Sequence, residues 1–501
     1  MRRLGAVMVG VAVVSFAAAA AGIDVRATYG ARTTGDEPYY LITAVTLSSD
    51  RDLDISDEIE AGAFREWHEI PLDEQTKSLE GGRRVSPHDP LLPLLLALPV
   101  ALGGWVGAKV FLAVLAGLLA ALVVWIAVRR FGVSVGAAGL TAGVIGASAP
   151  FAVYGNQVYP ELPAALCVAV AVAGLTGRPP QTGGFVALAA AITALPWLSI
   201  KYVPVAATLA VLGVVALWRA GRRRALGSFV AALALMGIAF VAGHLQWYGG
   251  VTPYAVGDHF SSGEFSVIGN EPNYSGRARR LLGLLVDRNF GLVAWQPAWF
   301  LIVPAAAALI RARPAAWGAL AFPLAAGWLN ATFIAPTMQG WWWPGRQLVV
   351  VLPCAVVCIA CWANGHRARL ATIALTGSLG IAALVWLLAD GLNRRITWVV
   401  DFYDTTNPLY GVWQHVLPDY LDVTSMTWVL HGAWLVLALA VAARTWLTAA
   451  SGLRRSFAAP RRAKGTEPRP SGEQSHWASA ELRCASPSER HGTPPSGRAS
   501  F

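Results

Sequence analysis

Charged residues are scarce in this chain, and acidic residues are absent from long parts of it. Only 14% of the 501 residues are charged, whereas 55% are hydrophobic. A soluble domain carries roughly a quarter charged residues. No acid lies between Asp89 and Glu161, between Glu161 and Asp258, or between Asp287 and Asp390. Because hydrocarbon cannot solvate charge, this shortage excludes an ordinary soluble protein and favours many lipid-facing helices.

Cysteine is also scarce, and its scattered placement indicates no disulfide framework. Three of the five cysteines, Cys354, Cys358 and Cys361, fall in one apolar run that contains no histidine or acid. A cysteine in such surroundings behaves as a small hydrophobic residue. We therefore interpret these three as core residues and not as a metal site.

The basic residues indicate how the chain is oriented. The net charge is +10, and Arg residues form short clusters between apolar runs, such as Arg129–Arg130 and Arg222–Arg224. Loops rich in Lys and Arg face the cytoplasm in membrane proteins. The clusters therefore predict membrane topology, and they argue against nucleic acid as a partner.

We predict an all-α, polytopic transmembrane helix bundle of about twelve spans with both termini in the cytoplasm. The first apolar run, Leu4 to Ala21, resembles a signal peptide, but the many later spans favour an uncleaved helix. Prolines in and just before Leu91 to Trp105 should break that segment, which we expect to be re-entrant or interfacial. The other spans are predicted at 106–128, 133–153, 162–175, 184–197, 203–218, 226–242, 291–310, 316–334, 348–362, 370–388 and 426–443.

Polar segments divide the chain further. Residues 1–447 are predicted to form the membrane domain. Within it, 23–89 is an acidic first extracytoplasmic loop with interfacial helices, and 244–290 and 390–425 are further outer loops. Residues 448–501 are rich in Arg, Ser and Pro, which predicts a disordered, basic cytoplasmic tail.

An acidic pair, Asp36 and Glu37, follows the first span. Pro38 and then apolar residues at helical spacing come next, so we predict a surface-lying helix that begins at the pair. Carboxylates are favourable at a helix N-terminus, and the pair could serve only as that helix start. It could also supply a general base, because it is predicted at a water-facing end of the bundle.

Further polar and aromatic residues are predicted at the outer ends of spans. They are His88, Asp89, Tyr159, Glu161, Lys201, Tyr202, Trp341, Trp342, Trp343 and Arg346. Trp, Tyr, Lys and Arg could also serve only as membrane anchors, because Trp and Tyr populate membrane interfaces and Lys and Arg snorkel there. Their predicted convergence with the acidic pair on one face is harder to explain by anchoring alone.

The pattern resembles the GT-C superfamily of membrane glycosyltransferases, especially bacterial relatives of protein mannosyltransferases and of the aminoarabinose transferase that modifies lipid A. The resemblance covers roughly residues 1–350. Asp89 departs from it, because these enzymes usually have a proline there. The matching segments are Asp36-Glu37 with Tyr40 and Ala44, His88-x-Pro90-Leu91, Arg129-Arg130-Phe131-Gly132, Pro160-Glu161, Asp287 to Leu292, and Pro344-Gly345-Arg346.

The resemblance implies an enzyme of the plasma membrane with an extracytoplasmic active site. Such enzymes transfer a sugar from a polyprenyl-phosphate donor to an acceptor by direct displacement, which implies an inverting transferase. The acceptor would be an envelope glycan, lipid or protein. No cofactor is firmly implied, because related families differ in their need for a divalent cation such as Mg²⁺ or Mn²⁺.

The resemblance also implies roles for the site residues. Asp36 would be the catalytic base, and Glu37 would either orient it or join it in binding a divalent cation. Lys201 and Arg346 would hold the lipid phosphate. The remaining predicted substrate-binding residues are His88 and Glu161, which would contact sugar or acceptor, Asp89, Tyr159 and Tyr202, and Trp342, which either stacks on sugar or anchors the loop.

Two other classes of protein remain as alternatives. A polytopic transporter or flippase of envelope precursors would place ionisable residues near the middle of the membrane. A non-catalytic assembly protein would use the acidic loop for docking. The predicted clustering of charge at one surface favours the enzyme over the transporter.

Overall fold

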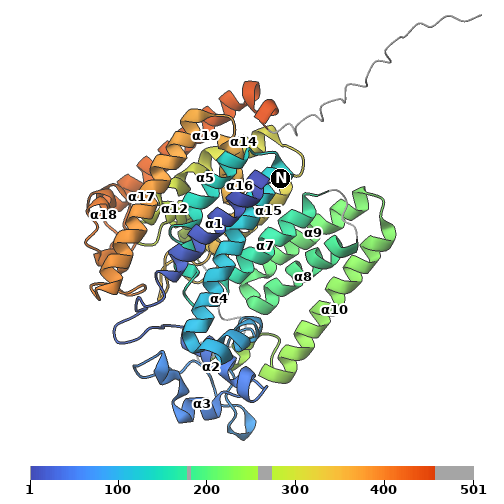
Figure 1. Ribbon diagram of the computed structural model, residues 1–501, viewed down its shortest axis with the longest axis vertical. Coiled ribbons are helices and arrows are strands. Elements are labelled where there is room, and N and C mark those ends of the chain that lie inside the picture. Colours follow the sequence, from blue (N-terminus) through green and yellow to red (C-terminus); the bar gives the residue numbers. More distant parts are fainter. Residues whose placement is uncertain (1, 178–181, 258–272, 457–501) are drawn as a thin grey trace, which may run out of the picture. The chain divides into compact units, whose positions relative to one another are not determined.

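The computed structural model describes residues 2–177, 182–257 and 273–456 (Figure 1). These residues are mostly helical, and the β structure among them is limited to isolated bridges such as Thr28 with Ala31. Helices are expected for apolar spans, because a backbone in lipid must satisfy its own hydrogen bonds. The predicted all-α class is confirmed, while most of the predicted tail and part of the 244–290 loop lie outside the described residues.

Apolar helices follow one another in the order of the predicted spans. Within the described ranges, six are long and apolar enough to cross a membrane: Arg2–Ala20, Leu91–Phe131, Ile200–Arg219, Arg223–Val256, Arg367–Leu392 and Ser425–Thr448. The shorter ones are Val135–Gly146, Glu161–Leu175, Gly184–Leu198, Pro297–Ala312, Gly318–Ile334 and Val349–Ala363. They fall below the roughly 20 residues of a perpendicular crossing. The chain is thus a helical membrane bundle in which pairs of long apolar helices are separated by groups of shorter ones.

The helices of the bundle are α1 (Arg2–Ala20), α4 (Leu91–Phe131), α5 (Val135–Gly146), α6 (Phe151–Tyr154), α7 (Glu161–Leu175), α8 (Thr182–Leu198), α9 (Val203–Arg219), α10 (Arg223–Tyr248), α14 (Ile302–Ala312), α15 (Gly318–Leu329), α16 (Leu352–Ala363), α17 (Arg367–Leu392) and α19 (Ser425–Ser456). The connections hold α2 (Glu37–Ser49), α3 (Ser56–Ala61), α11 (Tyr274–Ala278), α12 (Arg280–Val286), α13 (Leu292–Trp295) and α18 (Pro408–Trp413). They also hold 3₁₀ or π turns, which include η1 (Ala63–Glu66), η3 (Ile200–Tyr202), η8 (Asn330–Ile334) and η9 (Val349–Val351).

The core of the bundle lies along α4 and α16. Helix α4 packs against α1, α2, α5 and α7, and α16 packs against α4, α5, α14 and α15. Every residue of α16 is buried, including Cys354, Cys358 and Cys361, whose thiols are free. These cysteines are therefore core residues, as predicted.

Helix α4 corrects one prediction about chain breaks. Its two halves meet at Gly103 and Gly104, where the backbone is not helical (φ −149° and +58°), close to the predicted boundary at Trp105. The prolines do not cause the break. Pro93 lies in the first turn, where no backbone N–H is needed, and Pro99 stays inside the helix. A Cβ atom on Gly107 would lie 2.2 Å from the Pro99 carbonyl oxygen, so glycine permits this close approach.

The first loop gathers at one end of the bundle. Helices α2 and α3 lie beside the start of α4, at the end opposite the N-terminus of α1 (Figure 1). The helix predicted to begin at the acidic pair is confirmed as α2. Helix α10 continues to Tyr248, past the predicted loop start at 244, and α19 continues to Ser456, past the predicted start of the tail at 448.

Candidate active site

Asp36 stands immediately before α2, but its side chain does not cap the helix. Gly35 turns the chain with φ +57°, and Pro38 then sets the first turn of the helix. An Asp at this position normally accepts hydrogen bonds from the first free amides. Here Asp36 makes no such bond. Its Oδ2 atom instead accepts from Arg346 Nη2 at 2.6 Å.

Arg346 connects Asp36 to a second carboxylate. Its Nε atom donates to Glu161 Oε1 at 2.9 Å, and Lys201 Nζ donates to the same oxygen at 2.6 Å. The Glu161 side chain has no exposed surface. Carboxylates and cations therefore alternate along a row that runs from Asp36 through Arg346 and Glu161 to Lys201. Buried ion pairs of this kind cost desolvation energy, so they are weak evidence for stability and better evidence for a functional site.

The row is assembled from separate parts of the bundle. Glu161 is the first residue of α7, Lys201 lies in η3 after α8, and Arg346 lies between η8 and η9. Gly345 precedes Arg346 with φ +84°, and a Cβ atom there would lie 2.7 Å from Leu292 Cδ2. Only glycine fits this turn without strain. The turn then presents the guanidinium to both acids.

Aromatic rings cover the Arg346 guanidinium. Its Cζ atom lies 4.1 Å from the centre of the Tyr159 ring and 5.2 Å from that of Trp342. The Tyr159 hydroxyl donates to the Thr34 carbonyl at 3.3 Å. Trp343 is fully buried, whereas Trp341 is exposed. Of the three tryptophans, Trp342 is thus the one beside the ion pairs.

His88 faces Asp36 from the start of α4. Its Nε2 atom lies 4.0 Å from Asp36 Oδ1, and its ring stacks on Tyr40 with centres 4.6 Å apart. Burial, together with the nearby Arg346, lowers the pKa of His88 to about 4 although Asp36 opposes the shift. His88 is therefore neutral at pH 7.

The charges of Asp36 and Arg346 reinforce each other. Burial alone would raise the pKa of the Asp36 carboxyl, but the Arg346 guanidinium outweighs it and holds that pKa well below its usual range. Burial would likewise lower the pKa of Arg346, but Asp36 and Glu161 raise it well above its usual value. Both groups are therefore ionised at neutral pH.

Several buried polar atoms of this site have no hydrogen-bond partner. They are His88 Nε2, Glu161 Oε2, Tyr202 Oη and Asn330 Oδ1. Lys201 lies over the Tyr202 ring at 5.2 Å, and Asn330 Nδ2 donates to the Lys201 carbonyl at 3.1 Å. A half-satisfied buried network is costly. A polar ligand bound beside these atoms would satisfy them.

Glu37 is adjacent to Asp36 in sequence but is held by different partners. Its Oε1 atom accepts from the Val158 amide at 2.7 Å, and its Oε2 atom accepts from the Thr34 amide at 3.0 Å. Both oxygens of Glu37 and one oxygen of Asp36 are thus engaged. Binding of a shared divalent cation by this pair stays a prediction. Among the described residues, Asp50, Asp57 and Glu58 form a group of three acids whose carboxylate oxygens lie within 4.8 Å of one another.

Solved structures share the architecture of this chain. The crystal structure of ArnT from Cupriavidus metallidurans bound to undecaprenyl phosphate matches with a TM-score of 0.51 at 15% sequence identity. The match covers 90% of this chain and 73% of that one. The apo structure of the same protein gives a TM-score of 0.49 at 15% identity, covering 89% and 71%.

This chain shares the fold of the ArnT structure bound to undecaprenyl phosphate. The fold expected from the sequence resemblance is therefore confirmed. Neither a known protein family nor a curated protein matches the sequence.

Asp89 lies next to this row but has protein partners of its own. Its Oδ1 atom is 3.1 Å from His244 Nε2, and its Oδ2 atom accepts from the Ile200 amide at 2.9 Å. Sequence analysis singled out Asp89 and placed Tyr40 in a segment that carries the resemblance, but it missed His244 and Asn330. A histidine at the outer end of an apolar span was the available signal for His244. No pattern in the sequence indicated Asn330.

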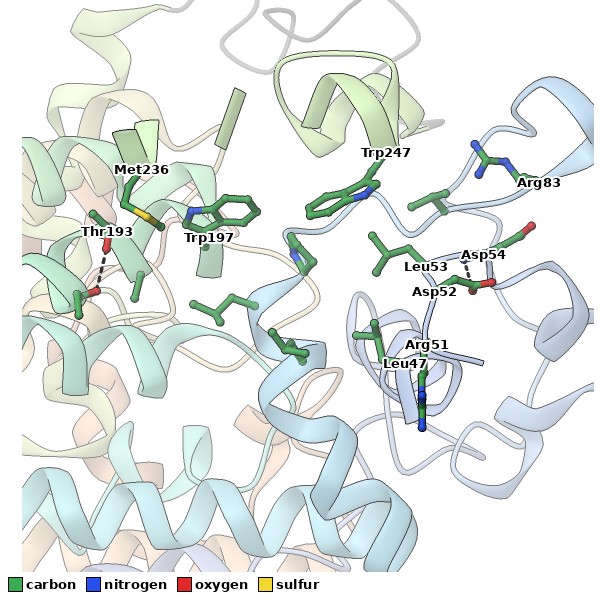
Figure 2. Close-up of a pocket in the computed structure, with 16 residues that line it drawn as sticks. Leu47, Arg51, Asp52, Leu53, Asp54, Arg83, Thr193, Trp197, Met236 and Trp247 are labelled. Atoms are coloured by element: carbon green, nitrogen blue, oxygen red, sulfur yellow. Dashed lines mark hydrogen bonds between the residues drawn. The ribbon is translucent and has the colours of Figure 1, made fainter. Parts of the chain in front are cut away.

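A cavity of about 700 Å³ lies between the first loop and helices α4, α8 and α10 (Figure 2). Trp197 of α8 and Trp247 and Met236 of α10 line one side, and Leu53 faces them from the loop. The lining is mostly apolar, and its charged residues come from the loop: Arg51, Asp52, Asp54 and Arg83. No residue of the polar row lines the cavity, but Pro90, the residue after Asp89, does.

Proposed function

We propose that this chain is a membrane glycosyltransferase. It would move a sugar from a polyprenyl-phosphate donor to a hydroxyl group of an envelope glycan, lipid or protein, on the extracytoplasmic face of the plasma membrane. One observation carries the proposal. An ionised carboxylate, Asp36, contacts the buried Arg346, which Glu161 links to the partly buried Lys201, beside polar atoms that lack protein partners.

The two cations suit the phosphate of a lipid-linked donor. Arg presents several N–H groups in a planar fork that matches phosphate oxygens, and Lys adds a compact charge. In the structure these groups are neutralised by Asp36 and Glu161. A donor phosphate would compete for Arg346 and leave Asp36 free to act. Direct competition thus links donor binding to activation of the base.

The proposed reaction is a direct displacement at the anomeric carbon. The acceptor oxygen forms the new bond to that carbon while its proton passes to Asp36. The bond between the carbon and the phosphate oxygen breaks, and the electron pair leaves with the phosphate. Arg346 and Lys201 stabilise the charge on the leaving group. The displacement inverts the configuration of the sugar.

Other residues would support this chemistry. Glu161 fixes both cations, Tyr159 and Trp342 flank the guanidinium, and Trp342 offers a partly exposed ring on which sugar can stack. Tyr202 and neutral His88 would contribute hydrogen bonds from their unpartnered atoms. Glu37 would hold the turn before α2 in place, and no metal-dependent step is proposed.

The apolar cavity supports a lipid-linked substrate. Its volume of about 700 Å³ and its lining by Trp197, Trp247 and Leu94 suit several isoprene units of a polyprenyl chain. Burial of apolar surface there would add roughly 25 cal/mol per Å² to binding.

A buried cation inside α4, Lys109, is the feature that a transporter would use. Its Nζ atom lies 3.3 Å from the Arg32 carbonyl oxygen and 3.4 Å from that of Ile23. These contacts tie the first loop to α4. They make a structural role for Lys109 more suitable than ion transport.

The test is sugar transfer by membranes that contain the full-length protein. Membranes are given a series of radiolabelled polyprenyl-phosphate sugars and an envelope extract as acceptor. We expect transfer by the wild-type protein, and a decrease of roughly 10²- to 10⁴-fold in Asp36→Asn. Asp73→Asn, the same change at an exposed acid of the same loop, is the matched control. Equal transfer by the Asp36→Asn protein would contradict the proposal.

A further inference from the structure

His244 is a fully buried histidine at the end of α10, and both of its ring nitrogens face oxygen atoms. Its Nδ1 atom lies 2.8 Å from the Phe240 carbonyl oxygen, and its Nε2 atom lies 3.1 Å from Asp89 Oδ1. His244 has no exposed surface, and Asp89 is 3% exposed. Neither group therefore has a path to a substrate through solvent.

The contacts determine how many protons the pair holds. A carbonyl oxygen can only accept, so Nδ1 carries a hydrogen. A second hydrogen must then lie between Nε2 and Oδ1, because neutral imidazole has no donor left at Nε2 and an ionised carboxylate has none either. With that second proton the pair is neutral overall, whichever atom carries it. A neutral, hydrogen-bonded pair avoids the cost of an unpaired buried charge.

The pair holds two segments of the proposed active site. Asp89 Oδ2 accepts from the amide of Ile200, the residue before Lys201. One helical turn after His244, the Tyr248 hydroxyl donates to the His88 carbonyl at 3.0 Å. Asp89 thus connects His244, at the end of α10, to the turn that carries Lys201. Tyr248 connects the same end of α10 to the segment that carries His88.

Aromatic packing fixes the His244 ring. Its centre lies 3.9 Å from that of Phe240 and 5.1 Å from that of Tyr248, and both rings are stacked on it. Trp197 of α8 packs against the same ring at 5.4 Å. The imidazole therefore has little freedom to rotate, which suits a group that positions others.

We propose that Asp89 and His244 are positioning residues, which set the place of Lys201 and His88 by sharing one proton between two buried side chains. The inference rests on the proposed function. It also changes the role expected for Asp89, which would act through the Ile200–Lys201 turn and not by touching the substrate.

An amide can replace the carboxylate in this arrangement. In Asp89→Asn the amide oxygen can accept from Ile200 while the amide NH₂ donates to Nε2 of a neutral His244. Every hydrogen bond is kept, and the shared proton is no longer needed. Asp89→Ala and His244→Ala each remove the contact and leave a buried polar partner unsatisfied.

The test compares these variants in the full-length protein, using donor KM, kcat and thermal stability in detergent. We expect Asp89→Asn to stay within about 3-fold of wild type in kcat and donor KM. Asp89→Ala and His244→Ala should each raise the donor KM by roughly 10-fold or more, because loss of a residue that orients ligand-binding groups typically weakens binding by that much. The double Ala variant should be no worse than either single variant, because both remove one interaction. His415→Ala, a change at an exposed histidine, is the control.

Other outcomes would overturn the inference. An Asp89→Asn protein as inactive as Asp36→Asn would mean that Asp89 acts by its charge. If the increases in donor KM of the two single Ala variants multiply in the double variant, the two residues act separately. If the Ala variants do not fold, Asp89→Asn and Tyr248→Phe still decide, since Tyr248→Phe should raise donor KM and leave kcat nearly unchanged. Absence of transfer by the wild-type protein would reject the proposed function alone, and the double-variant comparison of thermal stability would then decide whether the pair is coupled.

Discussion

Arg346 Nη2 donates to Asp36 Oδ2 at 2.6 Å, although the two residues are 310 positions apart in the chain. The contact joins the start of α2 to the loop before η9, and it combines with the Glu161–Lys201 ion pair in a single row. In the proposed function this row would provide a base and a phosphate site in one place. In the structure Asp36 and Arg346 pair with each other.

The geometry of Arg346 can be tested by replacing it with lysine. A lysine ammonium keeps the charge, but it cannot reproduce the fork that reaches both Asp36 and Glu161. Loss of one charge-assisted hydrogen bond costs roughly 1.5–3 kcal/mol. We therefore expect kcat/KM for the donor to fall by about 10- to 100-fold in Arg346→Lys. Arg65→Lys, at an exposed arginine of the first loop, should have little effect on this measurement.

The structural role of Glu37 predicts a loss of stability. In Glu37→Gln an amide NH₂ would face the amide N–H of Val158 or of Thr34, so one hydrogen bond is lost. We expect the free energy of unfolding to fall by roughly 1–3 kcal/mol. Thermal unfolding in detergent measures this, with the exposed Glu74→Gln as control. A stable but inactive Glu37→Gln protein would instead favour the catalytic or metal-binding role expected from the sequence.

Gly345 should be required for the placement of Arg346. A Cβ atom at this position would meet Leu292 Cδ2 at 2.7 Å, and the backbone has φ +84°. A left-handed conformation costs a non-glycine residue about 1–2 kcal/mol before any clash. Gly345→Ala should lower both thermal stability and transfer activity. Gly237→Ala is the control, because a Cβ atom there has nothing within 4 Å; the idea fails if both variants behave alike.

Glu58 predicts a pH dependence of stability. Burial, together with Asp57, raises the pKa of Glu58 from 4.5 to about 7 although the Thr46 hydroxyl opposes the shift. Because the folded pKa exceeds the unfolded one, the contribution of Glu58 is present below pH 4.5 and is lost as pH rises through 7. Glu58→Gln should therefore have the same Tm as wild type near pH 4.5 and a higher Tm at pH 8. The exposed Glu60→Gln should show no such divergence.

Much of the fold could be predicted from the sequence, because the length of each apolar run and the distribution of charge follow directly from the order of the residues. The start of α2 at the acidic pair was predictable for the same reason, since Pro38 and acids favour the first turn. The break in α4 was assigned to prolines, but the glycine pair Gly103–Gly104 makes it. The sequence does not reveal that Pro99 can remain helical when Gly107 leaves room beside it.

The site was less predictable, because its contacts join residues that are far apart in the chain. His244 pairs with Asp89 across 155 positions, and nothing local to either residue indicates the other. Glu37 was expected to work with Asp36 because they are neighbours. Successive side chains on a helix do not face each other, and here they meet different partners. Sequence position thus located the acids but not the direction of their carboxylates.

The central claim is that Arg346 and Lys201 bind the phosphate of a polyprenyl-phosphate donor beside Asp36. The most direct measurement is native mass spectrometry of the purified full-length protein with undecaprenyl phosphate or uncharged undecaprenol. We expect Arg346→Met to bind undecaprenyl phosphate at least about 10-fold more weakly than the wild-type protein does, because one charge-assisted contact is lost. Both proteins should bind undecaprenol equally weakly. Equal binding of undecaprenyl phosphate by the wild-type and Arg346→Met proteins would contradict the account.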